Sequence, residues 1–142
     1  MEYTGINMFI RIFETHEEMK KFFFMIEKCH TISEIRESKG LAKHVLMVMH
    51  TLNETIYNLN NMSYVSELLH EIGKKHRKYS DYSREFFLTI TEPFLLAVKE
   101  TLGDRFTPHM ETVYRKLILF IIDNLYQGFG ESAADKTKPI AG

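Results

Sequence analysis

Two histidines, His44 and His76, are the side chains whose positions in this sequence point to chemistry. Each lies on the apolar stripe of a predicted helix, and the members of the stripes recur at steps of three and four: Leu41, His44, Val48 and Leu52 in the first helix, and Val65, Leu69, Ile72 and His76 in the second. An imidazole that faces inward needs a hydrogen-bond partner or a metal. A single inward histidine is usually a core residue, but two on consecutive helices that can face each other favour a shared ligand.

The nature of that ligand is limited by the other residue types in the chain. A structural zinc ion usually takes four ligands from Cys and His, and this sequence has a single cysteine, Cys29. A planar cofactor that needs one or two axial nitrogens fits the pair of histidines better, and haem is the common cofactor of that kind. The alternative is a haem-free helical interaction module in which both histidines are core residues.

The elements that would position the two histidines are helices joined by short turns. An Asn-rich turn over residues 58–62 separates the two histidine helices, and Ser63 is the predicted N-cap of the second. A helix with one apolar face precedes them within residues 1–15. Residues 31–34 form a capping box, which predicts a short helix between the first helix and the histidine pair.

Two more helices are predicted in the C-terminal part of the chain. The first ends at Gly103 and contains Pro93, which should kink it because proline removes a backbone hydrogen bond. The second begins with Thr107 as N-cap and Pro108 as its first residue. Its pattern gives way at Gly128 to GFGESAADKTKPIAG, so we expect one domain over residues 1–129 and a disordered tail over residues 130–142.

Length and composition indicate one globular domain. A chain of 142 residues with 44% hydrophobic content can bury a core without disulfides or metals. The formal net charge of −1 gives no reason to expect nucleic acid or an anionic membrane surface as a partner. No apolar run reaches the roughly 18 residues of a membrane span, and one cysteine cannot form an internal disulfide, so we expect a soluble cytoplasmic protein.

With these helices in place, the chain resembles a globin. His44 is similar to the distal histidine of globin helix E, and His76, followed by Arg77, to the proximal histidine of helix F. Their separation of 32 residues and the run GKKHR are closest to the neuroglobin branch. The LG…FTP junction before the last helix is similar to the junction of globin helices G and H. The resemblance implies an all-α globin fold in which helices B to H surround a haem b pocket.

The resemblance also implies roles for individual residues. His76 would be the proximal iron ligand, and His44 would either stand near the sixth position or occupy it. The other expected cofactor-binding residues are Phe9, Phe23, Val48 and Ile72, with Phe22 as the alternative to Phe23. Gly5 falls where globins keep a small residue for the close crossing of helices B and E, and Val45 stands where many globins have glycine.

The start of the sequence departs from the family pattern. Only eight residues precede Phe9, so the resemblance implies that helix A and the first residues of helix B are missing. In globins helix A covers part of helices E and H. Without it, apolar surface is exposed or covered by another chain, so we expect lowered stability or a homo-oligomer formed through that surface.

As a function, the resemblance implies a haem protein that binds dioxygen reversibly for storage or transport. The alternative is a bis-histidyl, six-coordinate haem protein for electron transfer, nitric oxide or nitrite chemistry, or redox or oxygen sensing. We do not expect an enzyme, since nothing in the sequence resembles the Arg or acidic residue with which peroxidases drive O–O cleavage. The expected partner is dioxygen or another diatomic ligand.

Overall fold

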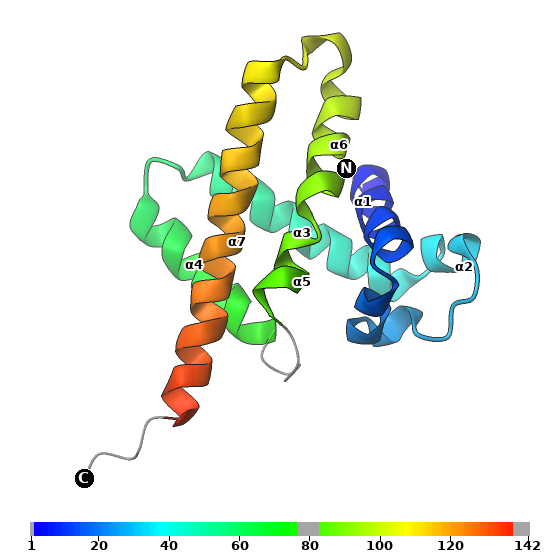
Figure 1. Ribbon diagram of the computed structural model, residues 1–142, viewed down its shortest axis with the longest axis horizontal. Helices are drawn as coiled ribbons and strands as arrows, with labels where there is room; N and C mark the ends of the chain where they lie inside the picture. Colours follow the sequence, from blue (N-terminus) through cyan, green and yellow to red (C-terminus); the bar gives the residue numbers. More distant parts are fainter. Residues whose placement is uncertain (1, 77–82, 138–142) are drawn as a thin grey trace.

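The computed structural model describes residues 2–76 and 83–137, and within those ranges the chain is all-helical, as predicted (Figure 1). Short 3₁₀ helices over Glu17–Phe22, Phe24–Ile26 and Gly103–Arg105 join the longer elements. The α-helices are α1 (Glu2–Thr15), α2 (Ile32–Arg36), α3 (Lys39–Tyr57), α4 (Met62–Lys75), α5 (Arg84–Leu88), α6 (Thr91–Leu102) and α7 (Pro108–Thr137).

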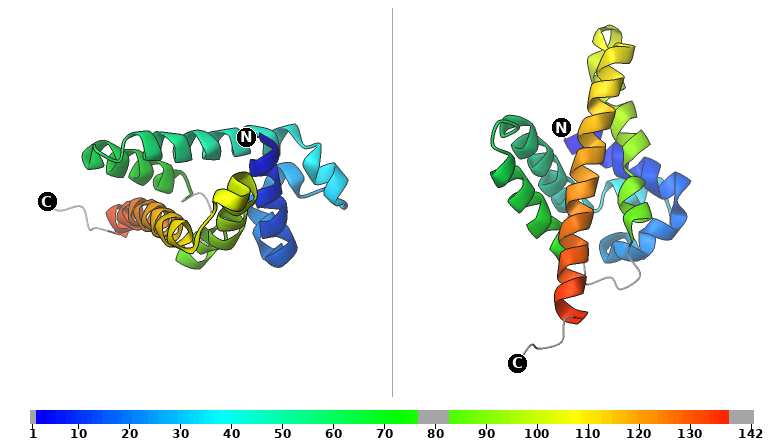
Figure 2. Two further views of the ribbon diagram at one scale, coloured as in Figure 1. Left: turned by 90° about the horizontal axis from the view of Figure 1, so that it is seen from above. Right: turned by 60° about the vertical axis from the view of Figure 1, so that its left-hand side comes forward.

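The helices are arranged in two crossed groups. The antiparallel pair α3 and α4 lies across α6 and α7, and α1 lies at the end of the molecule opposite the turn between α3 and α4 (Figure 2). Helix α4 packs along α7, and α1 packs against both α3 and α6. Because α3 and α4 carry the two histidines, this arrangement places both over the interior face of the second group.

Glycine lets α1 approach α3 closely, as expected for the crossing of globin helices B and E. A Cβ atom on Gly5 would collide with Cγ1 of Val45 and would lie 3.3 Å from Cγ of Met49. One glycine therefore accommodates the valine that follows His44. This crossing sets the distance between α1 and α3, and therefore the distance between His44 and the aromatic residues of α1.

Side-chain caps define most helix starts. Oγ1 of Thr31 accepts a hydrogen bond from the backbone N–H of Glu34 (3.1 Å), and Oγ1 of Thr107 accepts one from Met110 (3.2 Å), which confirms both predicted caps. The predicted cap at Ser63 is wrong by two residues. Asn61 caps α4 instead, with its Oδ1 accepting from the N–H of Tyr64 at 3.2 Å; asparagine competes well with serine at this position.

The helix that was predicted to contain Pro93 and to stop at Gly103 is divided into α5 and α6. The break lies at residues 89–90, where the carbonyl of Thr89 stands four residues before the proline and would meet its ring in a continuous helix. Pro93 itself lies in the first turn of α6, where its missing N–H has no intrahelical acceptor to lose. The expected kink is therefore a full break. Helix α6 ends at Leu102, and Gly103, the predicted stop, follows it with a φ of 55°.

The last helix continues beyond the predicted stop. The structure extends α7 to Thr137, so the helix end expected near Gly128 is wrong, whereas the domain boundary at residue 129 and the disorder of the tail stay predictions. The physical reason is that Gly128 is buried against α4 and does not act as a helix terminator. Residues 138–142 of the expected tail lie outside the described residues.

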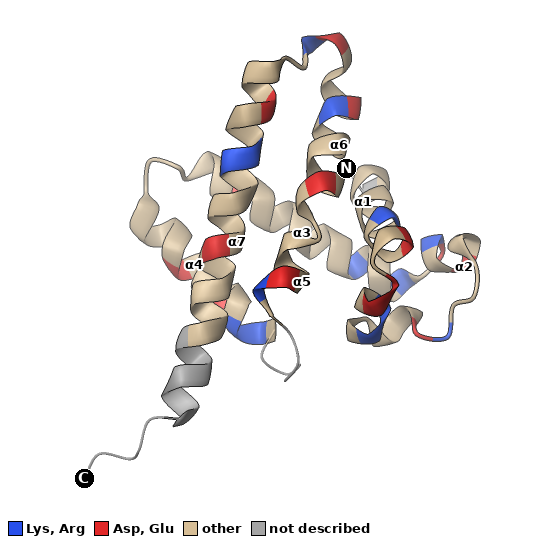
Figure 3. Cartoon of the chain, in the orientation of Figure 1, with Lys and Arg blue, Asp and Glu red and all other residues tan. Residues whose placement is uncertain are grey.

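Ion pairs on the surface join helices that are distant in sequence. Each pair is an arginine and a carboxylate at 2.7 Å: Arg11 with Glu100, Arg84 with Asp123, and Arg115 with Glu92. They link α1 to α6, α5 to α7, and α7 to α6. All are partly exposed, so each contributes at most about 1 kcal/mol. Basic and acidic residues are interspersed along the helices (Figure 3), in keeping with the net charge of −1.

Candidate functional site

A cavity of about 730 Å³ lies beneath α3 and α4. Its walls come from α1, the aromatic segment after it, α3, α4, α5 and α7. All of the residues that the sequence marks as site candidates line it: Phe9, Phe22, Phe23, His44, Val48, Ile72 and His76. Its size falls in the range of ligand sites, roughly 300–1,000 Å³. The predicted residues are thus brought to one place.

Two phenylalanine rings hold His44 against the wall of the cavity. The imidazole meets the ring of Phe9 edge-on at 5.2 Å and 80°, and that of Phe23 at 5.2 Å and 83°. Phe9 and Phe23 also contact each other edge-on at 5.7 Å. Such edge-to-face contacts favour one ring orientation. The half-buried His44 side chain is therefore oriented by α1 and by the segment between the two 3₁₀ helices.

A backbone carbonyl determines the tautomer of His76. Nδ1 of His76 lies 3.0 Å from the carbonyl oxygen of Ile72, one turn earlier in α4. A carbonyl can only accept, so Nδ1 carries a proton, and in the neutral imidazole Nε2 then carries the lone pair that a metal ligand needs. The ring of Phe87 packs against the imidazole at 5.0 Å and 60°. The contact is the kind of donation to a backbone carbonyl that was expected of His76, with Ile72 as the acceptor.

Side chains on the cavity wall are mostly apolar, and the charged ones are cationic. Lys43 from α3 and Lys75 from α4 line it, and no Asp or Glu among the described residues does. No three His, Cys, Asp or Glu residues among those described are grouped to hold a bare metal ion. The site therefore suits a large apolar ligand that contains a metal able to bind histidine nitrogens and that carries negative charge at its edge. The described residues do not support binding of a bare zinc ion.

Phe86 and Phe87 are the main wall residues that the sequence did not mark as site candidates. Phe86 packs edge-on against Phe22 at 5.1 Å, and Phe87 contacts His76. Helix α5 is only five residues long, so helical periodicity could not reveal its inward face. His50 is exposed but also lies at the cavity edge.

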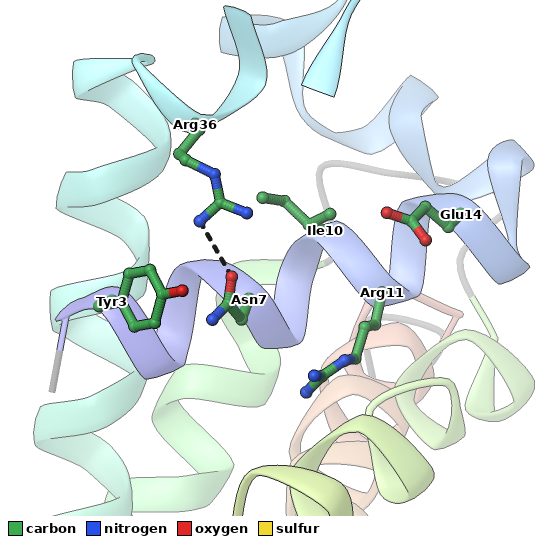
Figure 4. A pocket seen from close by; sticks show the side chains of 6 residues that line it. All are labelled: Tyr3, Asn7, Ile10, Arg11, Glu14 and Arg36. Atoms are coloured by element: carbon green, nitrogen blue, oxygen red, sulfur yellow. Dashed lines mark hydrogen bonds between the residues drawn. The ribbon is translucent and has the colours of Figure 1, made fainter. Parts of the chain in front are cut away.

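A smaller surface pocket of about 290 Å³ lies over α1, but its cations do not converge (Figure 4). Arg36 donates to Oδ1 of Asn7 at 2.9 Å, whereas Arg11 points to the other side of α1 and pairs with Glu100. The guanidinium groups are therefore engaged separately, and we assign no site here. No helix among the described residues is long and apolar enough to cross a membrane.

Fold and site together define a class: all-helical proteins with an apolar cavity flanked by one histidine from each of two consecutive helices. The globin family model matches residues 6–125. The chain belongs to the globin family, which confirms the fold predicted from the sequence.

Individual relatives agree with this assignment. Cytoglobin-2 of Danio rerio is 28% identical over 117 residues, which are 82% of this chain and 65% of that protein, so the chain spans less than two thirds of it. The neuroglobin of Dissostichus mawsoni is 24% identical over 132 residues, 93% of this chain and 82% of that one. A solved structure described as a hexacoordinated heme protein from an anhydrobiotic tardigrade superposes with a TM-score of 0.84 at 22% identity, covering 91% of this chain and 83% of its own.

Proposed function

We propose that this globin binds haem b in the cavity, with His76 as the proximal ligand, and that it binds dioxygen reversibly. The observation that carries the proposal is the contact between Nδ1 of His76 and the carbonyl of Ile72, because it leaves Nε2 of the neutral imidazole as the nitrogen that can bind a metal. Bound haem would supply an iron centre that accepts a diatomic ligand. The apolar walls and the family assignment support haem over other ligands.

The remaining wall residues have roles that follow from their positions. His44 would donate a hydrogen bond to the diatomic ligand, because its ring is held at the wall by Phe9 and Phe23. Val48 and the two phenylalanines would exclude water from the cavity, which would protect reduced iron from oxidation. Lys43 and Lys75 would neutralise the negatively charged edge of the cofactor.

A second candidate function is that of a bis-histidyl haem protein for electron transfer, nitric oxide or nitrite chemistry, or sensing. The favouring observation is that His44 lines the same cavity as His76 from the neighbouring helix. The solved neighbour described as hexacoordinated gives this candidate weight. In such a protein an external ligand must first displace His44, which lowers its apparent affinity by the fraction of time the site is open.

Reversible oxygenation separates the two candidates. Haem-loaded protein is reduced without oxygen, exposed to oxygen, and returned to an oxygen-free atmosphere while its absorption spectrum is followed. We expect a spectrum that changes on exposure and returns on removal, over several cycles. Oxidation within the first exposure would move the assignment to the redox or sensor function.

A non-enzymatic role remains our proposal. The charged residues that line the cavity among those described are lysines, and neither an arginine nor a carboxylate faces it to drive O–O cleavage. This composition supports ligand binding over peroxidase chemistry. The cytoplasmic location stays a prediction of the sequence.

Self-association also stays a prediction. On α3 and α7, the helices that helix A partly covers in globins, Ile56, Tyr57 and Val113 are exposed, with Tyr57 at 83%. Sedimentation velocity should show a mass that rises with concentration, and the double variant Ile56→Ser, Val113→Ser should shift it toward the monomer. A monomer at every concentration for the unmodified chain would contradict the prediction.

A further inference from the structure

We propose that Gly73 and Gly128 are positioning residues for His76, because they let α4 and α7 lie backbone against backbone beside the cavity. This inference rests on the proposed function, since it concerns the placement of the proximal ligand. It assigns a role to two glycines that neither the histidine pair nor the crossing of α1 and α3 explains.

The contact between α4 and α7 is reciprocal. A Cβ atom on Gly73 would collide with the backbone carbonyl of Leu125, and a Cβ atom on Gly128 would collide with the backbone of His70. Residues 70 and 73 lie about one turn apart on α4, and residues 125 and 128 about one turn apart on α7. Each helix therefore contacts the main chain of the other through one glycine. A main chain cannot move aside as a flexible side chain can.

Neither glycine is required by its own backbone conformation. Among the described glycines only Gly103 has a positive φ, so any residue could adopt the backbone at 73 and 128. Glycine in a helix interior is unfavourable relative to alanine. Both residues are buried, which leaves close helix approach as the reason for their presence.

Two short routes connect this contact to His76. The first route runs along α4, where Gly73 directly follows Ile72. The carbonyl of Ile72 contacts Nδ1 of His76, and the side chain of Ile72 lines the cavity, as does Leu125 of α7. Across the helices, Phe129 directly follows Gly128 and packs on Phe87 at 6.3 Å, and Phe87 packs on the His76 ring. A side chain at either glycine would separate α4 from α7 and displace His76 along both routes.

Gly130 provides a matched control. It lies in α7 two residues after Gly128, and a Cβ atom there would meet nothing within 4 Å. The same chemical change can therefore be made at two crowded positions, in Gly73→Ala and Gly128→Ala, and at an open position, in Gly130→Ala. We expect Gly130→Ala to raise the Tm of the haem-free protein through helix propensity, and the other two variants to lower it.

Readouts at His76 distinguish positioning from general stability. In the haem-free protein, ¹⁵N NMR should report the Nδ1–H tautomer of His76 in the unmodified chain and in Gly130→Ala, and a mixture of tautomers in Gly128→Ala. In the haem-loaded proteins, Gly128→Ala should lose haem to an excess of a scavenging protein about tenfold faster or more. A lowered Tm with unchanged tautomer and unchanged haem loss would overturn the proposal.

Failure of the proposed function can be told apart from failure of this inference. If the unmodified chain takes up no haem, the function fails, and the NMR comparison of the haem-free variants still decides the role of the glycines. If Gly128→Ala does not fold, Phe129→Leu interrupts the route through Phe87 without crowding the helices. A changed balance of His76 tautomers in that variant supports the inference, and an unchanged balance overturns the route through Phe87.

Discussion

His76→Ala is expected to yield a folded helical protein that no longer retains haem. His76 is half-buried at the C-terminal end of α4, so its removal takes away the nitrogen donor and the ring contact with Phe87 while leaving the apolar clusters intact. Loss of second-sphere groups alone weakens metal sites about 10- to 100-fold, so loss of the ligand itself should weaken binding by more than about 100-fold. Optical titration with haem measures the effect.

The control for this variant is His50→Ala. His50 lies at the edge of the same cavity but is exposed, so its removal deletes an imidazole from the site without deleting the proposed ligand. We expect His50→Ala to bind haem like the unmodified chain, and free imidazole to restore partial binding to His76→Ala. Full haem stoichiometry in His76→Ala would show that this histidine is not the ligand.

His44→Leu is expected to change the iron environment without loss of haem. Leucine keeps apolar volume between Phe9 and Phe23 but removes the nitrogen. If His44 occupies the sixth position, the low-spin spectrum of the reduced protein becomes five-coordinate and high-spin. If His44 instead donates to the diatomic ligand, loss of that hydrogen bond should speed oxygen release about tenfold.

The matched change for this prediction is His50→Leu on the same helix, which should alter neither the spectrum nor the release rate. Stopped-flow mixing after reduction measures both. A His44→Leu protein with unchanged spectrum and unchanged oxygen release would show that His44 is a wall residue without a part in ligand binding, which contradicts the role that each candidate function gives to His44.

Helical periodicity was sufficient to place the two histidines, since the interior face of α3 and α4 follows from local spacing. The carbonyl partner of His76 also follows from local geometry, because Ile72 lies one turn earlier in the same helix. Gly5 could be paired with α3 only through the family resemblance, and the structure brings it to Val45.

For the three phenylalanines at residues 22–24, local spacing does not predict which side chains face the cavity. The chain there passes between two 3₁₀ helices, so α-helical periodicity does not apply. Phe23, the preferred candidate, faces His44, whereas Phe22 packs on Phe86 and Phe24 is 75% exposed. Only the position of α5 shows that Phe22 also belongs to the wall.

Gly128 illustrates a second limit of sequence reasoning. Glycine is both a common helix terminator and the residue that permits close helix contact, and the two roles look alike in a single sequence. The partner backbone at His70 distinguishes them, and it lies 58 residues away along the chain. A long-range contact of this kind explains why α7 continues past Gly128.

The most direct test of the central claim is an optical titration of the haem-free chain with haem, followed by reduction without oxygen. The account predicts a break at one equivalent and a reduced spectrum typical of histidine-ligated iron, with neither feature in His76→Ala. A linear rise without a break would contradict the claim and leave the globin fold as a haem-free helical module.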